Sequence, residues 1–398
     1  MRLSTAHTHD KTIERLSQRQ LELSDAQLRM TTGKRVMRAS DDPINAARAE
    51  RALASVSRAD AGTRSVEASR NAMTQTEAAL GDAGDLLQQV REALVASGNA
   101  AYDDSQRKVL AEQIRGLRDQ LLAVANRGDG AGGYLFGGQG SATPPFLDAP
   151  GGVQYVGTRG AINAARGESL PMTMDGDAAW LTAPSGNGVF ETRVVTAAGS
   201  GWIDAGRVTD PTALTGAKYS LQFTVSSGTT TYSVLKDGVA TPVTDVAYVP
   251  GQAIAIDGMA FAVSGAPADG DEFAIEPSTP SLSVFDALDA AANELATPLR
   301  NPGAIAQTTS TGLRDVDALL ARLSLSRSAA GEALTRIDNT GARHDAARTS
   351  GQIERSNAED LDLTAAISDF QTRQTGYQVA LQTYASVQRL SLFDYIKT

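Results

Sequence analysis

The sequence predicts a mainly α protein in which both chain ends build a long, heptad-patterned helical bundle around an inserted β-rich domain, giving α+β overall. Three observations predict this class. Apolar residues recur at heptad spacing towards both ends of the chain. Of the 14 prolines, all but Pro43 lie between Pro144 and Pro302. Within that interval apolar and polar residues alternate, which is typical of strands.

The composition limits the class of partner. The chain has 398 residues, enough for two or more domains, and only 5% of them are aromatic, as expected where alanine and leucine pack helices closely. A formal net charge of -10 argues against nucleic acid and an anionic membrane surface as partners. Because there is no cysteine, disulfides, thiolate metal sites and a cysteine nucleophile are excluded.

The first residues, MRLSTAHTHDKTIERL, lack the apolar core of a signal peptide. No apolar run is long enough to span a bilayer. We therefore expect no membrane partner. If the protein is exported, we expect a route that needs no signal peptide.

Residues 1–33 are expected to form one helix that ends at Gly33, since glycine is preferred just after a helix. Apolar residues and glutamines separated alternately by three and four residues give this helix a coiled-coil seam of a and d positions. The predicted seam consists of Ile13, Leu16, Gln20, Leu23, Gln27 and Met30.

The last stretch of the chain carries the same pattern, so we expect the two ends to pack together. Its predicted seam consists of Ile367, Phe370, Gln374, Tyr377, Leu381, Tyr384 and Gln388. A glutamine at an a position lowers stability and specifies register or partner. That is the role predicted for Gln20, Gln27, Gln374 and Gln388.

The chain end beyond this seam is more apolar than a free, solvated tail normally is, with Leu392 and Phe393 among its residues. A heptad stripe by itself usually indicates core packing. The seam glutamines and the apolar end favour an assembly interface, because such a surface is expected to be covered by another molecule.

Long helices should also form the part of the chain next to each end. Asp41, Asp42 and Pro43 predict a helix start, because an acidic N-cap and a proline at the first helical position both suit a helix N-terminus. Apolar residues then recur every seven positions, from Val66 to Leu94. The predicted divisions are 1–40 and 359–398 for the terminal coiled coil, 41–143 and 281–358 for the helical bundle, and 144–280 for the β-rich insert.

The insert shows hairpin patterns. Tyr219, Leu221, Phe223 and Val225 alternate with polar residues and are followed by a second run, TYSVLK, after a short turn. AIAIDGMAFAV predicts another strand pair around Asp257-Gly258. The acidic run Asp269–Glu272 fits no full calcium loop, and a hairpin turn explains it better.

The sequence offers no arrangement that indicates catalysis. There are three histidines, and His7 and His9 lie beside no other ligand cluster. Gly33-Lys34 is not a phosphate loop, because Leu28 stands where the first glycine is needed. We therefore predict no catalytic residue, no metal and no cofactor, and a protein that is not an enzyme.

Four segments resemble one family, the flagellin superfamily, and within it the hook-associated proteins of the hook–filament junction. TTGKRVMRASDDPINAA matches the segment between that family's first two helices. ANRGDGAGGYLFGGQGSATPPF and GAPADGDEFAIEP are similar to two further signatures of the hook-associated proteins. The segment from Leu361 to Ile396, with its ending SLFDYI, resembles their C-terminal helix.

The resemblance implies a structural subunit of the bacterial flagellum in the junction zone between hook and filament. Implied partners are copies of the same chain, the first hook-associated protein on the hook side, flagellin on the filament side, and an export chaperone on the C-terminal segment before secretion. It also implies an extracellular location, export through the flagellar channel, and termini that become ordered on assembly. The alternatives are a flagellin-type filament subunit and a secreted adhesin that displays the β insert.

Overall fold

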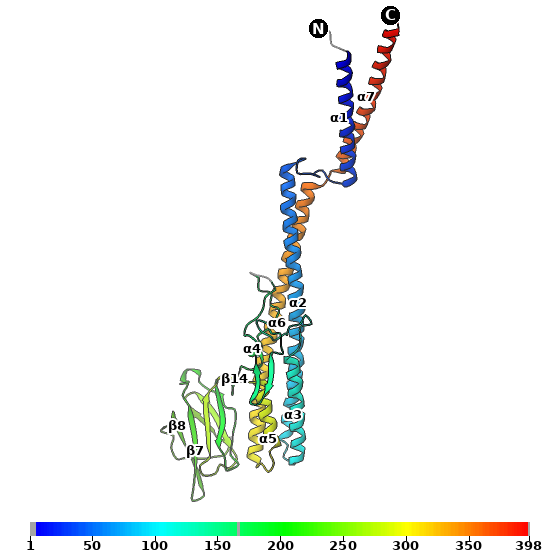
Figure 1. Ribbon diagram of the computed structural model, residues 1–398. Coiled ribbons are helices and arrows are strands. Elements are labelled where there is room, and N and C mark those ends of the chain that lie inside the picture. Colours follow the sequence, from blue (N-terminus) through cyan, green and yellow to red (C-terminus); the bar gives the residue numbers. More distant parts are fainter. Residues whose placement is uncertain (1–4, 165–167, 397–398) are drawn as a thin grey trace. The chain divides into compact units, whose positions relative to one another are not determined.

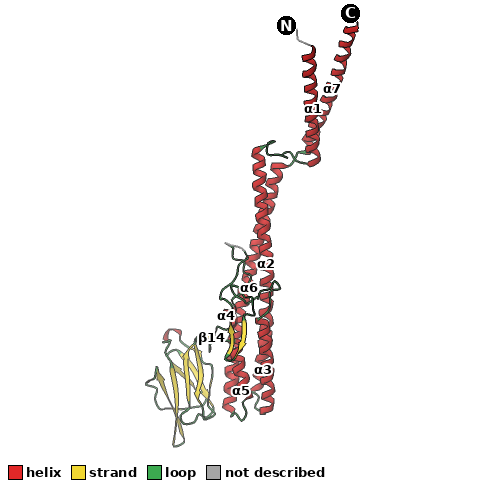
Figure 2. Cartoon of the chain, viewed as in Figure 1, coloured by secondary structure: helices red, strands yellow, loops and turns green. Residues whose placement is uncertain are grey.

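The structure, a computed structural model, describes residues 5–164 and 168–396, with side chains described over residues 10–164 and 168–386. The chain divides into two compact units, Met1–Arg64 with Thr340–Thr398, and Ser65–Asn339. Figure 1 labels the elements, and Figure 2 separates helices from strands. The predicted fold class is confirmed, because the helices come from both parts of the chain and the strands lie between them in sequence.

The first unit is helical. It holds α1 (Thr5–Thr32), the beginning of α2 (Pro43–Ser97), the end of α6 (Pro302–Glu359) and α7 (Leu363–Ile396). α1 ends where the sequence predicts, because Gly33 adopts a φ of 67°, a left-handed conformation that glycine reaches without a steric penalty.

In this unit α2 and α6 run antiparallel and approach closely at two glycines. A Cβ built on Gly351 would lie 2.8 Å from Val56 Cγ2, and one built on Gly62 would lie 2.4 Å from His344 Cε1. Neither distance leaves room for a side chain, so these glycines set how closely the two helices pack.

The helices of the second unit share one apolar core. The rest of α2 and α6 packs here with α3 (Asp104–Ala125) and α5 (Val284–Ala296). The heptad residues Leu80, Leu87 and Leu94 are fully buried in this core. α3 begins with a capping box between Asp103 and Gln106, and α5 begins at Ser283, whose hydroxyl accepts a hydrogen bond from the Asp286 N–H.

Aromatic rings fill the side of this bundle near α4 (Gly176–Trp180). Trp180 is fully buried and stacks on Phe285 of α5 with 6.0 Å between ring centroids. Phe136, from the glycine-rich segment 128–141, meets Trp180 edge-on at 5.4 Å. The hairpin of β1 (Phe146–Ala149) and β2 (Gly152–Tyr155) adds Phe146 to the cluster. The glycine-rich segment is therefore part of the bundle core.

The inserted domain consists of two antiparallel sheets with a common apolar core. One sheet has the order β10-β8-β7-β13-β4 with β9 paired to β8, and the other has β11-β12-β5 with β6 paired to β12. The larger sheet contains β4 (Phe190–Thr196), β7 (Tyr219–Ser226), β8 (Thr229–Lys236), β9 (Val239–Ala240), β10 (Val246–Ala247) and β13 (Glu272–Pro277). The smaller contains β5 (Trp202–Ile203), β6 (Arg207–Val208), β11 (Ala253–Ile256) and β12 (Met259–Ser264), and the short 3-10 turn η1 spans Pro211–Ala213.

Both predicted hairpins are found in this domain, as β7 paired with β8 and β11 paired with β12. The acidic run is a structural turn. Asp271 is fully buried, and its carboxylate accepts hydrogen bonds from the N–H groups of Ala198, Gly199 and Ala268. These bonds leave the carboxylate no role as a calcium ligand.

The chain enters and leaves the inserted domain through one short ladder, in which β3 (Ala183–Pro184) pairs with β14 (Pro280–Leu282). Arg314 of α6 ties the domain to the bundle by donating to the carbonyl oxygen of Thr192 at 2.8 Å. Gln307 of α6 accepts a hydrogen bond from the Ile203 N–H at 2.9 Å.

Candidate functional site

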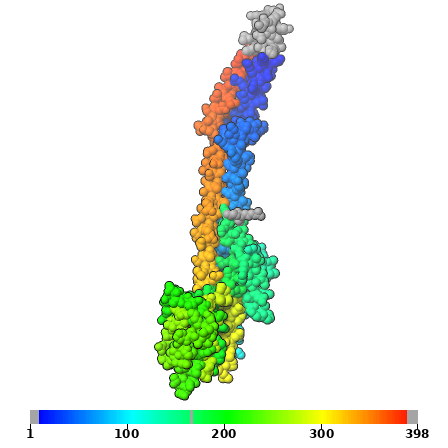
Figure 3. Space-filling model, turned by 90° about the vertical axis from the view of Figure 1, so that its left-hand side faces the viewer, coloured from blue at the N-terminus to red at the C-terminus, as the bar shows by residue number. Residues whose placement is uncertain are grey.

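The terminal helix pair, α1 with α7, is the site where the sequence predicts assembly. Arg19 Nη1 donates to the Gly376 carbonyl oxygen at 2.9 Å, and Arg373 Nη1 lies 3.5 Å from Glu22 Oε2. At the base of the pair, the Leu361 N–H donates to the Gly33 carbonyl oxygen at 2.9 Å. These contacts define an antiparallel pair, and Figure 3 shows the two helices side by side, α1 in blue and α7 in orange to red.

One predicted row on each helix lies in the contact. Leu16, Leu23 and Met30 of α1 are half-buried, as are Phe370, Tyr377 and Tyr384 of α7. Among the side chains that the structure describes in these two helices, none is buried. The pair therefore covers its apolar residues only partly, in contrast to the fully buried heptad leucines of α2.

The other predicted row lies outside the contact between the two helices, so the predicted seam is wrong for these positions, and their role in assembly stays a prediction. Ile13, Ile367 and Leu381 are 43%, 45% and 42% exposed, and Gln20, Gln27 and Gln374 are exposed as well. The half-buried positions lie one residue earlier on each helix: Thr12 and Ala26 with Arg19 between them on α1, and Ala366, Arg373 and Ala380 on α7. Arg19 keeps its stem exposed but reaches across to α7.

The observed seam is thus rotated by one residue position from the predicted seam, and the physical reason is the volume of the side chains that face each other. The register set by the Arg19 and Arg373 contacts places Ala26 level with Phe370, and Ala380 level with Leu16. Phe370 and Leu16 thus each have an alanine opposite, which lets the helices approach closely there. Isoleucine, leucine or glutamine in those places would push the helices apart.

The rotation leaves an uncharged face on one side of the pair, formed by Ile13, Gln20, Gln27, Ile367, Gln374 and Leu381. These residues follow the half-buried rows by one position, about 100° around each helix. In an antiparallel pair, two such rows lie on the same side. The opposite side carries Arg15, Glu22, Arg29 and Asp369.

Three predicted residues cannot be placed in this geometry. The side chains of Gln388, Leu392 and Phe393 lie outside the residues whose side chains the structure describes. Their roles in register and assembly stay predictions.

The comparisons with known proteins agree with this architecture. The family model of the bacterial flagellin N-terminal helical region matches residues 3–141. The chain is 33% identical over 196 residues to flagellar hook-associated protein 3 of Escherichia coli (strain K12), covering 48% of this chain and 57% of that protein. It is 35% identical over 156 residues to flagellar hook-associated protein 3 of Salmonella typhimurium, covering 38% of this chain and 48% of that one. The alignments thus span about half the length of these curated relatives.

Solved structures extend the likeness over most of the chain. The crystal structure of flagellar hook-associated protein 3 from Legionella pneumophila matches with a TM-score of 0.71 and 25% identity, over 76% of this chain and 97% of that one. The Xanthomonas campestris FlgL crystal structure matches with a TM-score of 0.69 and 28% identity, over 77% and 99%. Residues 3–141 are thus similar to the flagellin N-terminal region, and most of the chain shares the fold of these solved structures.

The segment between α1 and α2 forms a clasp at the base of the terminal pair, in which Gly33–Val36 lies against Ala358–Leu361. The Arg35 N–H donates to the Glu359 carbonyl oxygen at 2.6 Å, and Lys34 Nζ lies 2.7 Å from Glu359 Oε2. The hydrogen bond from Lys34 and the nearby Arg355 lower the pKa of the Glu359 carboxyl below its usual range. The clasp therefore joins the connection between α1 and α2 to the connection between α6 and α7 by a backbone hydrogen bond and an ion pair.

The predicted helix start is correct for two of its three residues. Asp42 precedes Pro43, the first residue of α2, and its Oδ1 accepts a hydrogen bond from the Asn45 N–H at 3.0 Å, which also lowers its pKa. Asp41 is not a helix cap. Its carboxylate faces back along the chain and accepts hydrogen bonds from the N–H groups of Met37 and Arg38, so it holds the turn before the helix.

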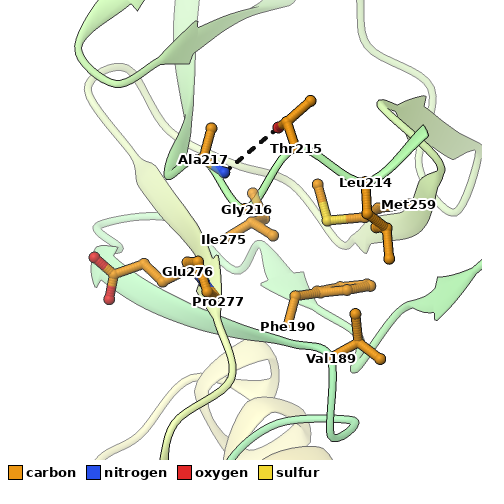
Figure 4. A pocket seen from close by; sticks show the side chains of 10 residues that line it. All are labelled: Val189, Phe190, Leu214, Thr215, Gly216, Ala217, Met259, Ile275, Glu276 and Pro277. Carbon is orange, nitrogen blue, oxygen red and sulfur yellow. Dashed lines mark hydrogen bonds between the residues drawn. The ribbon is translucent and has the colours of Figure 1, made fainter. Parts of the chain in front are cut away.

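The inserted domain holds a small cavity of about 70 Å³ at one end of its two sheets (Figure 4). Apolar side chains such as Phe190, Met259 and Ile275 line it. Its one carboxylate, Glu276, is paired with Arg193 at 3.2 Å and with Lys218 at 3.1 Å. Sites for small-molecule ligands usually measure about 300–1,000 Å³ and hold converging polar groups, so this cavity does not favour a ligand-binding adhesin.

In the part of the chain that the structure describes, no helix is long and apolar enough to cross a membrane. Over the same residues, there is no cluster of three or more histidines and carboxylates that could hold a metal ion.

Sequence reasoning missed the two residues that cross between α1 and α7, Arg19 and Arg373. Hydrophobic periodicity gives arginine no weight in a seam. A signal was nonetheless available in Gly376, since a glycine in a helix interior costs about 1 kcal/mol relative to alanine and often marks a close approach of another group.

Proposed function

We propose that the protein is a structural subunit of the bacterial flagellum that forms the junction zone between hook and filament. The observation that carries this proposal is the terminal helix pair. It has the antiparallel seam of an assembly element, yet none of its described side chains is buried in the single chain. The names of the curated relatives and of the solved structures, all hook-associated or junction proteins, support the same role.

The uncharged face is the surface that we assign to neighbouring copies of this chain. Its apolar members are between 42% and 45% exposed, and its glutamines carry hydrogen-bond donors and acceptors without a charge. Fully burying such an apolar side chain contributes about 1.5–3 kcal/mol, and less than half of that remains to be gained here, so a copy packed on this face supplies burial that the isolated pair lacks. Ordering of the termini is then coupled to polymerisation.

The remaining partners follow from the resemblance to the superfamily. The first hook-associated protein lies on the hook side and flagellin on the filament side. An export chaperone binds the C-terminal segment before secretion, and the chain leaves through the flagellar export channel to an extracellular position. The role is structural, and no enzymatic activity is proposed.

Deletion and localisation test this function. Cells that lack the protein should build hooks but release unpolymerised flagellin into the medium. An epitope-tagged chain should label the hook end of sheared flagella. Normal filaments in the deletion strain would refute a junction role. Label along the whole filament would indicate a flagellin-type subunit, and loss of adhesion alone would indicate an adhesin.

A further inference from the structure

We propose that Arg19 and Arg373 set the register of the terminal helix pair, in place of the glutamines that the sequence suggested. The proposal rests on the proposed function, because register matters only if the pair is an assembly element. It specifies which residues fix the geometry of the surface that neighbouring copies meet.

The apolar seam cannot fix the register alone. Leu16, Leu23 and Met30 repeat every seven residues, and so do Phe370, Tyr377 and Tyr384. A slip of one heptad, about 10 Å along the axis, again places large side chains in the seam on both helices. Gln20, Gln27 and Gln374 are exposed and lie on the uncharged face, outside the seam between the two helices.

The Arg373 contact does distinguish them. In the observed register Arg373 lies 3.5 Å from Glu22 and is held by Asp369 of its own helix at 2.7 Å. Arg15 precedes Glu22 by seven residues and Arg29 follows it by seven. A one-heptad slip in either direction would therefore replace the attraction to Glu22 by repulsion from another arginine.

The Arg19 contact supports the same register. Its guanidinium donates to the Gly376 carbonyl oxygen, and a Cβ at position 376 would lie 3.0 Å from Arg19 Nη1. The missing side chain gives the guanidinium access to a backbone oxygen in mid-helix. One heptad away, position 383 is a threonine whose hydroxyl already donates to Val379. In the other direction Arg19 would meet Asp369, which attracts it, so against that slip the register rests on the contact of Arg373 with Glu22.

The native protein offers a clean measurement, because it contains no cysteine. Gln20→Cys is combined in the full-length chain with Ile367→Cys, Gln374→Cys or Leu381→Cys, which lie along the uncharged face one heptad apart. A short bis-maleimide then reports which position lies level with residue 20. Cross-linking is measured on the purified chain and on sheared flagella, and a cross-link in either sample reports the register.

The Gln20/Gln374 pair should dominate in the parental chain. In Arg373→Glu, Glu22 repels the new carboxylate, whereas Arg15 and Arg29 attract it. The yield of the cross-link between positions 20 and 374, relative to the other two cross-links, should therefore fall about tenfold, as expected when one exposed ion pair is exchanged for another that favours a slipped register. Adding Glu22→Arg, Arg15→Glu and Arg29→Glu to Arg373→Glu inverts the charge at each of these four positions. The preference for cross-linking at position 374 should then return. Asp25→Lys, a charge change off the seam, should leave it unaltered.

An unchanged profile in Arg373→Glu would overturn the proposal, as would a failure of the inverted set to restore it or a parental chain that cross-links at none of the three positions. The junction role is read separately, by the position of the tagged chain on sheared flagella. A chain that keeps its register but is absent from the hook end would refute the function alone.

Discussion

Replacing one phenylalanine in the terminal pair and one in the bundle should separate assembly from folding. Phe370 on α7 is half-buried, whereas Phe285 on α5 is fully buried. Phe285 also stacks on Trp180 at 6.0 Å and lies 5.8 Å from the Arg118 guanidinium. The same change, phenylalanine to alanine, thus meets two different environments.

The two variants should lose different amounts of stability. Phe285→Ala leaves a cavity in a closed core and should lower the free energy of unfolding of the isolated chain by about 3–5 kcal/mol. Phe370→Ala removes a ring that is only partly covered, so the loss in the isolated chain should be about 1 kcal/mol. Under the proposed function, neighbouring copies complete the burial of that site, so the same variant should prevent filament growth from the hook.

Urea unfolding of the purified chains, followed by circular dichroism at 222 nm, measures the first effect. Flagellin released into the medium by cells that carry each variant measures the second. Phe285→Ala should fail through low abundance, and Phe370→Ala should fail although the chain is present at its normal level. Equal losses of stability in the two isolated variants would refute the assignment of the pair to assembly, because Phe370 would then be a core residue.

Three further outcomes are expected. Ile367→Glu, which puts a charge on the uncharged face, should block polymerisation without lowering the melting temperature of the isolated chain. Asp25→Lys is the control and should polymerise normally, so equal polymerisation by the two variants would contradict this prediction. Glu359→Gln should cost less than ~1 kcal/mol at pH 7. Because Lys34 holds the pKa of this carboxyl below its ordinary value of 4.5, the cost should shrink as the pH falls through that lowered pKa. Thermal melts over a series of decreasing pH values decide it, and a cost that does not change with pH would speak against the ion pair. Gly351→Val should destabilise the α2–α6 contact near Val56, seen as faster amide exchange in residues 49–59, whereas Gly331→Val, at a site with no atom within 4 Å of the added Cβ, should leave that exchange unchanged.

The order of helices and β-rich insert along the chain could be predicted, because heptad periodicity and the positions of the prolines indicate it. Leucines every seven residues specify a helix with one buried stripe, and Leu80, Leu87 and Leu94 lie where that rule puts them. The β-rich insert was marked by alternation and turns, as at β7 and β8. Both signals are local properties of the chain, so they do not depend on knowing its partners.

The details of the terminal pair could not be predicted in the same way. Judged by the size of their apolar side chains alone, Ile13 and Leu381 are better candidates for the seam than Ala26 and Ala380. The packing of two helices depends, however, on the summed volume of the side chains that face each other. The identity of the seam is therefore a property of the pair, and neither helix contains it separately. Asp41 shows the same limit on a smaller scale, because which neighbouring N–H groups a carboxylate reaches depends on the turn around it.

The ladder of β3 with β14 has a consequence for how such a chain can change. The Ser185 N–H donates to the Thr279 carbonyl oxygen at 2.9 Å, so the two points where the inserted domain is spliced into the bundle are neighbours in space. A segment whose ends already touch can be shortened, lengthened or exchanged while the helices that flank it keep their places. The sequence and length of the inserted domain can therefore diverge while the helices that precede β3 and follow β14 stay unchanged.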